Sequence, residues 1–269
     1  MSDPDPDVRQ LAMRRFTVLR QQHAKLHVER DHMVVNVKRN IMAGFHRQLG
    51  AHDHAFKKAE WEVARLKREL ELVKGAEKEG EVDYERISGV LDAEFEPRAH
   101  ELEAAPRQME WANRRLSTLM NHEQSAAFQA RYRRLAQRLH PDLRLEQGGM
   151  VGNLWDRARE CYAAGDAAEL EAIELLAEDL PAEAVETSPL EDINRRVDAL
   201  KHANGRIINE IATLRREWPF PLIDKLPDEK WLSAQRAEYA QKTARLIAER
   251  EALAEELNRV LDVRPPDKQ

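Results

Sequence analysis

Apolar residues recur at helical spacing through most of the chain, and this periodicity limits the fold more strongly than any other feature of the sequence. The spacing places the apolar side chains of each run on one face of a helix. Three runs carry it: Phe56, Ala59, Val63, Leu66, Leu70 and Val73; Leu190, Ile193, Val197, Leu200, Asn204, Ile207, Ile211 and Leu214; and Leu232, Tyr239, Leu246, Leu253, Leu257 and Val260. No stretch alternates apolar and polar residues as a half-buried strand does. The sequence therefore predicts an all-α fold in which each apolar stripe needs a partner helix.

Glycines, prolines and charged segments divide this helical sequence into consecutive parts. Gly50 predicts a turn between two antiparallel helices, and Pro97 and Pro106 predict breaks or kinks in a later helical segment. The expected parts are a frayed lead-in at 1–7, an N-terminal helical hairpin at 8–75, connecting helices at 84–120, a small helical bundle at 121–180, an antiparallel coiled-coil hairpin at 189–263 and a tail at 264–269. Helical hairpins and coiled coils are thus expected on both sides of the small bundle.

Charge and composition exclude several classes of partner. The chain of 269 residues carries 43 basic and 49 acidic side chains, a net charge of -6, so it has no general attraction to phosphate backbones or anionic lipid. Its single cysteine, Cys161, cannot form an intrachain disulfide. The amino terminus is acidic and lacks the pattern of a signal peptide, and no apolar run approaches the roughly 20 residues that span a bilayer. We expect a cytoplasmic protein without nucleic acid or membrane as a partner.

The stretch from Tyr132 to Asp142 is the most specific part of the sequence. It reads as a basic helix that ends at the tripeptide His140-Pro141-Asp142. Between Glu123 and Arg144, five arginines stand against two acidic residues, an excess of three positive charges on an acidic chain. A patch of opposite sign is suited to steering an acidic partner towards the helix.

The proline determines the backbone of the tripeptide. Pro141 cannot continue a helix, and it pushes His140 towards an extended conformation, so the three residues are expected in a loop. Asn121, with Gln124 three residues later, predicts a capping box at the start of the basic helix. A carboxylate displayed at the loop could pair with an arginine of a partner and favour one conformation of that partner.

These motifs together resemble a J domain, the signature module of DnaJ-type co-chaperones, over residues 121 to about 179. Tyr132-Arg-Arg-Leu135, the His-Pro-Asp tripeptide and Trp155-x-x-Ala158-x-x-Cys161-Tyr162 stand where that family has its basic second helix, its loop and its third helix. The resemblance implies a core formed by Tyr132, Leu135, Leu139, Trp155, Ala158 and Tyr162. It also implies a chaperone-binding surface formed by His140, Pro141, Asp142, Arg131, Arg133, Arg134 and Arg138.

What the resemblance implies about function is an effector and not an enzyme. The chain would stimulate ATP hydrolysis by a DnaK-type chaperone, without a cofactor of its own. The coiled coils would bind an unknown client or assembly, and their seams would close within one chain or in a homodimer. The competing hypothesis is a coiled-coil scaffold that keeps a degenerate J fold without stimulating an ATPase.

Several features of the family are missing from this sequence. No Asp-Tyr-Tyr-x-x-Leu-Gly motif precedes the basic helix, so residues 111–120 would have to take the place of the first helix. Leu143 follows the tripeptide where a basic residue is usual, and neither a Gly/Phe-rich linker nor Cys-x-x-Cys repeats are present. These differences exclude a general-purpose DnaJ.

The histidines allow two chemical alternatives. His140 and Asp142 as a catalytic acid and base would need a nucleophile or a second carboxylate cluster nearby, and the sequence offers neither. His23 and His27 lie at helical i, i+4 spacing, but two ligands in one place fall short of a zinc site. The expectation is therefore solvated helix surface and no metal site.

Overall fold

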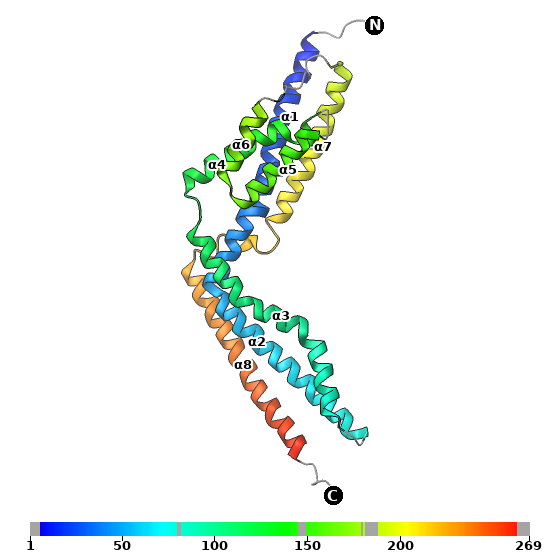
Figure 1. The fold of residues 1–269 in the computed structure, drawn as a ribbon, viewed down its shortest axis with the longest axis vertical. Coiled ribbons are helices and arrows are strands. Elements are labelled where there is room, and N and C mark those ends of the chain that lie inside the picture. Colours follow the sequence, from blue (N-terminus) through cyan, green and yellow to red (C-terminus); the bar gives the residue numbers. More distant parts are fainter. Residues whose placement is uncertain (1–5, 80–81, 145–148, 179, 181–187, 263–269) are drawn as a thin grey trace. The chain divides into compact units, whose positions relative to one another are not determined.

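The computed structural model describes residues 6–79, 82–144, 149–178, 180 and 188–262. Every regular element in these ranges is helical, which confirms the all-α prediction (Figure 1). The helices are α1 (Pro6–His32), a π-helical segment (Met33–Val37), α2 (Lys38–Glu79), α3 (Tyr84–Ser117), α4 (His122–Leu139), a 3-10 turn (Pro141–Leu143), α5 (Gly149–Ala164), α6 (Ala167–Glu178), α7 (Leu190–Leu214), a second 3-10 turn (Phe220–Leu222) and α8 (Glu229–Asp262).

The chain divides into two compact units, and the boundaries fall inside the expected parts. The first unit consists of Met1–Asn40 and Leu119–Pro221, and the second of Ile41–Thr118 and Leu222–Gln269. In the first unit α1 runs along α7 and also contacts α4, while α4, α5 and α6 pack on one another (Figure 1). One core joins all five helices, with Ala24 of α1, Ile173 of α6 and Ile193 of α7 fully buried within it.

The second unit is built from α2, α3 and α8. Its core cluster takes residues from each helix, namely Leu70, Val73, Ile87, Leu91 and Leu257. Ion pairs follow the edges of this core, as between Lys67 and Glu249 at 2.6 Å and between Arg65 and Asp92 at 2.9 Å. The seam of α2 is therefore closed by two helices of the same chain.

Both expected hairpins are wrong in their choice of partner helices. The turn at Gly50 is absent, because α2 continues through it from Lys38 to Glu79. One glycine costs a helix only about 1 kcal/mol, which packing on α3 and α8 offsets. At the other end of the chain, α7 packs on α1 in the first unit and α8 belongs to the second. The heptads correctly indicated that each stripe needs a partner, but a stripe does not specify which one.

Prolines affect the course of two helices. The helix α1 begins at Pro6 rather than after residue 7, and proline is well suited to a first helical position. Pro97 and Pro106 lie inside α3, which is bent along its length and not broken, so of the two expected effects of these prolines the structure has the kink (Figure 1). Residues 1–5 of the expected lead-in and the expected tail at 264–269 lie outside the described residues.

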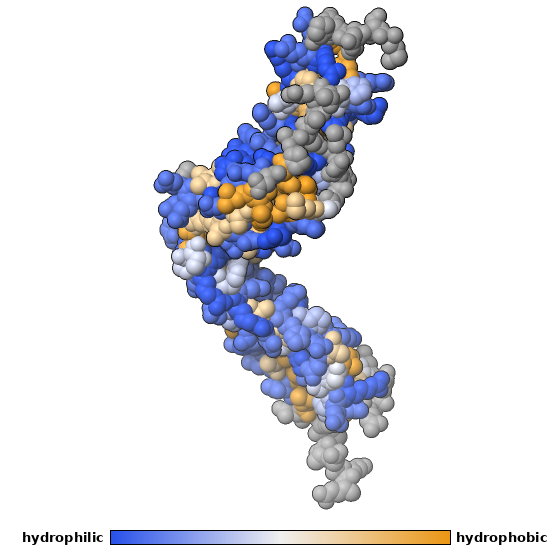
Figure 2. Space-filling model, turned by 45° about the horizontal axis from the view of Figure 1, so that its top comes forward, coloured by the Kyte–Doolittle hydropathy of each residue, from blue (hydrophilic) through white to orange (hydrophobic). Residues whose placement is uncertain are grey.

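The surface is mostly hydrophilic on the face shown in Figure 2, with an apolar patch on the first unit. Large apolar side chains that are exposed on the first unit include Met150 of α5 and Leu175 and Leu176 of α6. Within the described ranges, no helix combines the length and the apolar character needed to cross a membrane.

Two neighbouring isoleucines of α7 test the packing of α1 against α7. Ile207 is 6% exposed and Ile208 is 45% exposed. We expect Ile207→Ala to lower the free energy of unfolding by about 2–4 kcal/mol, because it leaves a cavity in the core. Ile208→Ala should change it by no more than about 0.5 kcal/mol. Denaturant unfolding followed by circular dichroism measures both, and equal effects would show that α7 does not present this face to a core.

Candidate functional site

The two helices of the J-like segment form a packed hairpin held together by aromatic rings. Tyr132 of α4 stacks on Tyr162 of α5, with ring centroids 4.1 Å apart and planes 8° apart. Tyr132 also stacks on Trp155 of α5, with ring centroids 5.5 Å apart. The Tyr132 hydroxyl donates a hydrogen bond of 2.8 Å to Asp31 Oδ2 of α1, and burial raises the pKa of Tyr132. The stack fixes the orientation of α4, and therefore of the loop that follows it.

Every residue that was expected in the J-like core is buried. The set is Tyr132, Leu135, Leu139, Trp155, Ala158 and Tyr162. The helix that covers them is α1, which supplies Ala24 and Val28 to the same core. Residues 111–120 do not take the place of a first helix. The residues of this segment up to Thr118 belong to the second unit, and Leu119 and Met120 are exposed.

The expected local structure around the tripeptide is confirmed. Asn121 and Gln124 form the capping box of α4, with Gln124 N donating to Asn121 Oδ1 at 2.8 Å. At the other end His140 adopts φ -61° and ψ 129°, the extended conformation that Pro141 imposes. The Asp142 backbone N–H donates to His140 Nδ1 at 3.2 Å and begins the short turn Pro141–Leu143.

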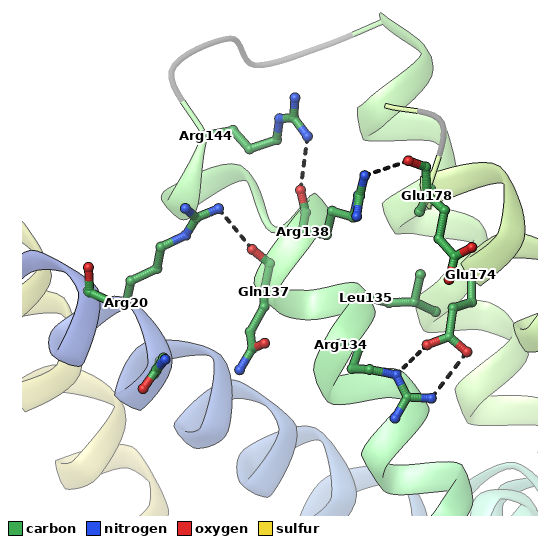
Figure 3. A pocket seen from close by; sticks show the side chains of 11 residues that line it. Arg20, Arg134, Leu135, Gln137, Arg138, Arg144, Glu174 and Glu178 are labelled. Atoms are coloured by element: carbon green, nitrogen blue, oxygen red, sulfur yellow. Dashed lines mark hydrogen bonds and ion pairs between the residues drawn. The ribbon is translucent and has the colours of Figure 1, made fainter. Parts of the chain in front are cut away.

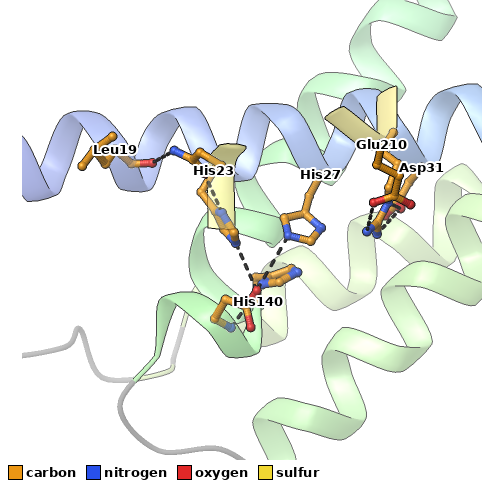
Figure 4. A network of polar contacts seen from close by, with 9 residues as sticks. Leu19, His23, His27, Asp31, His140 and Glu210 are labelled. Atoms are coloured by element: carbon orange, nitrogen blue, oxygen red, sulfur yellow. Dashed lines mark hydrogen bonds and ion pairs between the residues drawn. The ribbon is translucent and has the colours of Figure 1, made fainter. Parts of the chain in front are cut away.

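The imidazole of His140 is packed inside the first unit and is not displayed to solvent. His140 is 6% exposed, and its ring centroid lies 3.9 Å from that of His27 and 5.0 Å from that of Trp155. The ring of His23 is 5.3 Å away and is fully buried. Figure 4 shows His23 and His27 projecting from α1 towards His140. The expectation that His23 and His27 form solvated surface is therefore wrong.

A buried asparagine orients the first of these histidines. Asn204 is the polar residue in the heptad of α7, and its Nδ2 donates to the Leu19 carbonyl at 3.2 Å. Its Oδ1 consequently faces His23 Nδ1, 2.8 Å away, and accepts a hydrogen bond from it. This contact holds the Nδ1 edge of the His23 ring against Asn204 and turns Nε2 to the opposite side.

His23 Nε2 faces a carboxylate. His23 Nε2 lies 3.3 Å from Asp142 Oδ2, and His27 Nε2 lies 3.9 Å from the same oxygen. His23 Nε2 and both ring nitrogens of His27 are buried without a hydrogen-bond partner among the described residues. The Asp142 side chain is 51% exposed, so it reaches both the histidines and the solvent.

Burial keeps two of the three rings neutral. It lowers the pKa of His27 to about 2, and the neighbouring His140 and His23 add to this effect. It lowers the pKa of His140 to about 4 against the opposing influence of Asp142. At neutral pH His27 and His140 therefore carry an unshared electron pair and no charge.

The arginines of α4 are engaged by α6 to different degrees. Arg131 Nε pairs with Glu174 Oε2 at 2.9 Å, Arg134 pairs with the same carboxylate, and Arg138 Nη2 donates to the Glu178 carbonyl at 2.7 Å. Arg131 and Arg138 are half-buried, so these two members of the expected chaperone-binding surface do not simply project into solvent. Arg133 is exposed and forms no ion pair within the described part of the chain.

A groove of about 480 Å³ lies beside these arginines, between α1, α4 and α6. Four arginines and two glutamates carry its charges: Arg20, Arg134, Arg138, Arg144, Glu174 and Glu178 (Figure 3). Arg20 and Arg144 donate to the carbonyls of Gln137 and Arg138, at 3.1 and 3.0 Å, so their positions are fixed. The groove keeps an excess of two positive charges, a basic surface within an acidic chain.

Sequence reasoning did not place His23, His27, Asn204 and Arg20 at this site. The available signals were the i, i+4 pair of histidines and the polar residue in a heptad core. The sequence does not indicate that α1 packs on α4 and α7, and this packing brings these residues to the end of the tripeptide loop.

Asn204 tests the hydrogen-bond network at the site. We expect Asn204→Ala to destabilise the chain by about 1–3 kcal/mol, because the buried His23 N–H loses its acceptor. His202→Ala, on an exposed position of the same helix, should stay within about 0.5 kcal/mol. Denaturant unfolding of both variants compares the two positions. Unfolding of His23→Ala and of Asn204→Ala combined with His23→Ala completes the cycle that measures the coupling between the two side chains. Additive effects would contradict the assigned contact.

Comparison of the chain with protein-family models, curated proteins and solved structures gives no match. The resemblance to a J domain therefore rests on the motifs of this sequence, and the role of the site has to be argued from its geometry.

Proposed function

We propose that the chain is a non-enzymatic co-chaperone of J type that engages a DnaK-type ATPase through its first unit. The packing of α4 on α5 supports this most directly, because the stack of Tyr132 on Trp155 and Tyr162 fixes the tripeptide at the end of a basic helix. The arrangement agrees with what the family motifs imply, although α1 supplies the covering helix.

The geometry gives the parts of the surface different roles. The buried His140 accepts the Asp142 N–H and shapes the loop, so its contribution is structural. Asp142, half exposed, can still pair with an arginine of the ATPase. Exposed Arg133 and the arginine-lined groove attract an acidic surface, since complementary charge raises the rate of encounter and sets orientation. Clients would bind elsewhere on the chain.

Steady-state ATP hydrolysis by the DnaK-type chaperone of the host tests the proposal. The wild-type chain should raise the rate several-fold. Asp142→Asn and Arg133→Glu should each weaken this stimulation by about tenfold or more, because a lost charge pair at an interface costs about 2–5 kcal/mol.

Arg195→Glu is the matched control for charge reversal. Arg195 lies on α7 with its side chain 74% exposed, and this variant should stimulate like the wild type. Circular dichroism of all three variants checks that they are folded. A wild-type chain that leaves the ATPase rate unchanged, or variants that all stimulate equally, would refute the co-chaperone proposal.

A helical scaffold without ATPase stimulation is the second candidate function. The observation that favours it is the enclosure of the tripeptide, since His140 lies against His27 and Trp155 and three arginines of α4 are bound to α6. On this account the first unit is a docking element for another protein. Binding of the ATPase, or of a different partner, without any change in hydrolysis would select the scaffold.

A further inference from the structure

Three histidines and one aspartate meet at the end of the tripeptide loop, and we propose that His23, His27, His140 and Asp142 bind a divalent transition-metal ion of the zinc class. Each residue offers one ligand atom, and these atoms all lie within 4.8 Å of one another. It is the single group of this kind among residues 6–79, 82–144, 149–178, 180 and 188–262. The proposal is independent of the co-chaperone proposal.

The spacing of the ligand atoms is close to that of a tetrahedral site. Bonds of 2.0–2.1 Å to zinc place two ligands of a tetrahedron about 3.3 Å apart. His23 Nε2 and Asp142 Oδ2 are 3.3 Å apart, and His27 Nε2 and Asp142 Oδ2 are 3.9 Å apart. The longer distances, which reach at most 4.8 Å, would be shortened by rotation of the His27 and His140 rings towards the ion. His140 would bind the ion through one of its ring nitrogens. Coordination through Nδ1 would replace the 3.2 Å hydrogen bond that Nδ1 accepts from the Asp142 backbone N–H.

The orphaned nitrogens supply the second and independent observation. Asn204 Oδ1 engages His23 Nδ1, so Nε2 is the ring nitrogen that faces the Asp142 carboxylate. A cation held between His23 Nε2 and Asp142 Oδ2, which lie 3.3 Å apart, is attracted by both of these electron-rich atoms. His27, only 6% exposed, has no hydrogen-bond partner for either of its ring nitrogens. A metal ion satisfies these atoms together.

The ligand types indicate the class of ion. Imidazole nitrogens favour zinc, copper, nickel and iron, whereas calcium and magnesium take oxygen ligands. Three neutral imidazoles and one carboxylate form a four-coordinate set of the kind that zinc occupies. Asn204 accepting from His23 Nδ1 is the outer hydrogen bond that orients a metal-bound histidine. A histidine ligand coordinates through an unprotonated ring nitrogen, and each of the three histidines offers one such atom to the site.

Such an ion would hold α1 to the loop after α4. His23 and His27 come from α1, in the first segment of the unit, and His140 and Asp142 come from the turn after α4, in its second segment. The site would therefore join segments more than a hundred residues apart. It would also hold Asp142 on the side of α1.

Zinc titration of the full chain, after a chelator has been removed by dialysis, tests the proposal. Isothermal calorimetry should report one Zn²⁺ per chain, and Co²⁺ should give the visible absorption bands of a tetrahedral nitrogen and oxygen site. His23→Gln with His27→Gln should lose this binding. Asp142→Ala should weaken it by at least about tenfold, as expected when a residue of a metal site is removed.

The variants are chosen so that misfolding cannot mimic the result. Asp142 is half exposed, so its replacement leaves the core intact even if the double histidine variant unfolds. His202→Gln, on the exposed face of α7, is the matched control and should bind like the wild type. A wild-type chain that binds no Zn²⁺, or Asp142→Ala and the control binding alike, would overturn the proposal. ATPase stimulation is a separate readout, so either proposal can fail alone.

Discussion

The contact of α1 with the end of α4 is the constraint on which the first unit depends. Asp31 of α1 accepts from the hydroxyl of Tyr132, and His23 and His27 of the same helix enclose the ring of His140. The side chain of Asn204 then links α1 to α7. One helix thus covers the J-like hairpin, closes the heptad of α7 and sets the environment of the tripeptide.

This packing changes what a His-Pro-Asp loop can offer to a partner. The imidazole is used inside the unit, whereas the carboxylate of Asp142 stays half exposed. On α4, Glu174 and the carbonyl of Glu178 hold three arginines in fixed positions, and Arg133 remains exposed. A basic surface that is ordered in advance loses less side-chain entropy when it binds. The same ordering, however, leaves fewer charges free to rearrange around a partner.

The sequence predicted what depends on local physics. The helical periodicity, the capping box at Asn121, the extended His140 before Pro141 and the buried face of α4 all follow from neighbouring residues. The choice of partner helices does not follow from neighbouring residues, because any apolar stripe can pack against any other. Gly50 shows the same limit, since packing of α2 on α3 and α8 overrides its weak helix propensity. The metal-ligand set required His23 and His140 to meet across the fold, which no local pattern contains.

The central claim is that His140 lies against α1 inside the first unit. Nuclear Overhauser contacts between histidine ring protons, recorded on protein labelled only at histidine, test it directly. The ring centroids of His27 and His140 are 3.9 Å apart, so a strong contact between these two rings is predicted, with a weaker one from His140 to His23. A His140 ring that shows neither contact and exchanges freely with solvent would contradict the account.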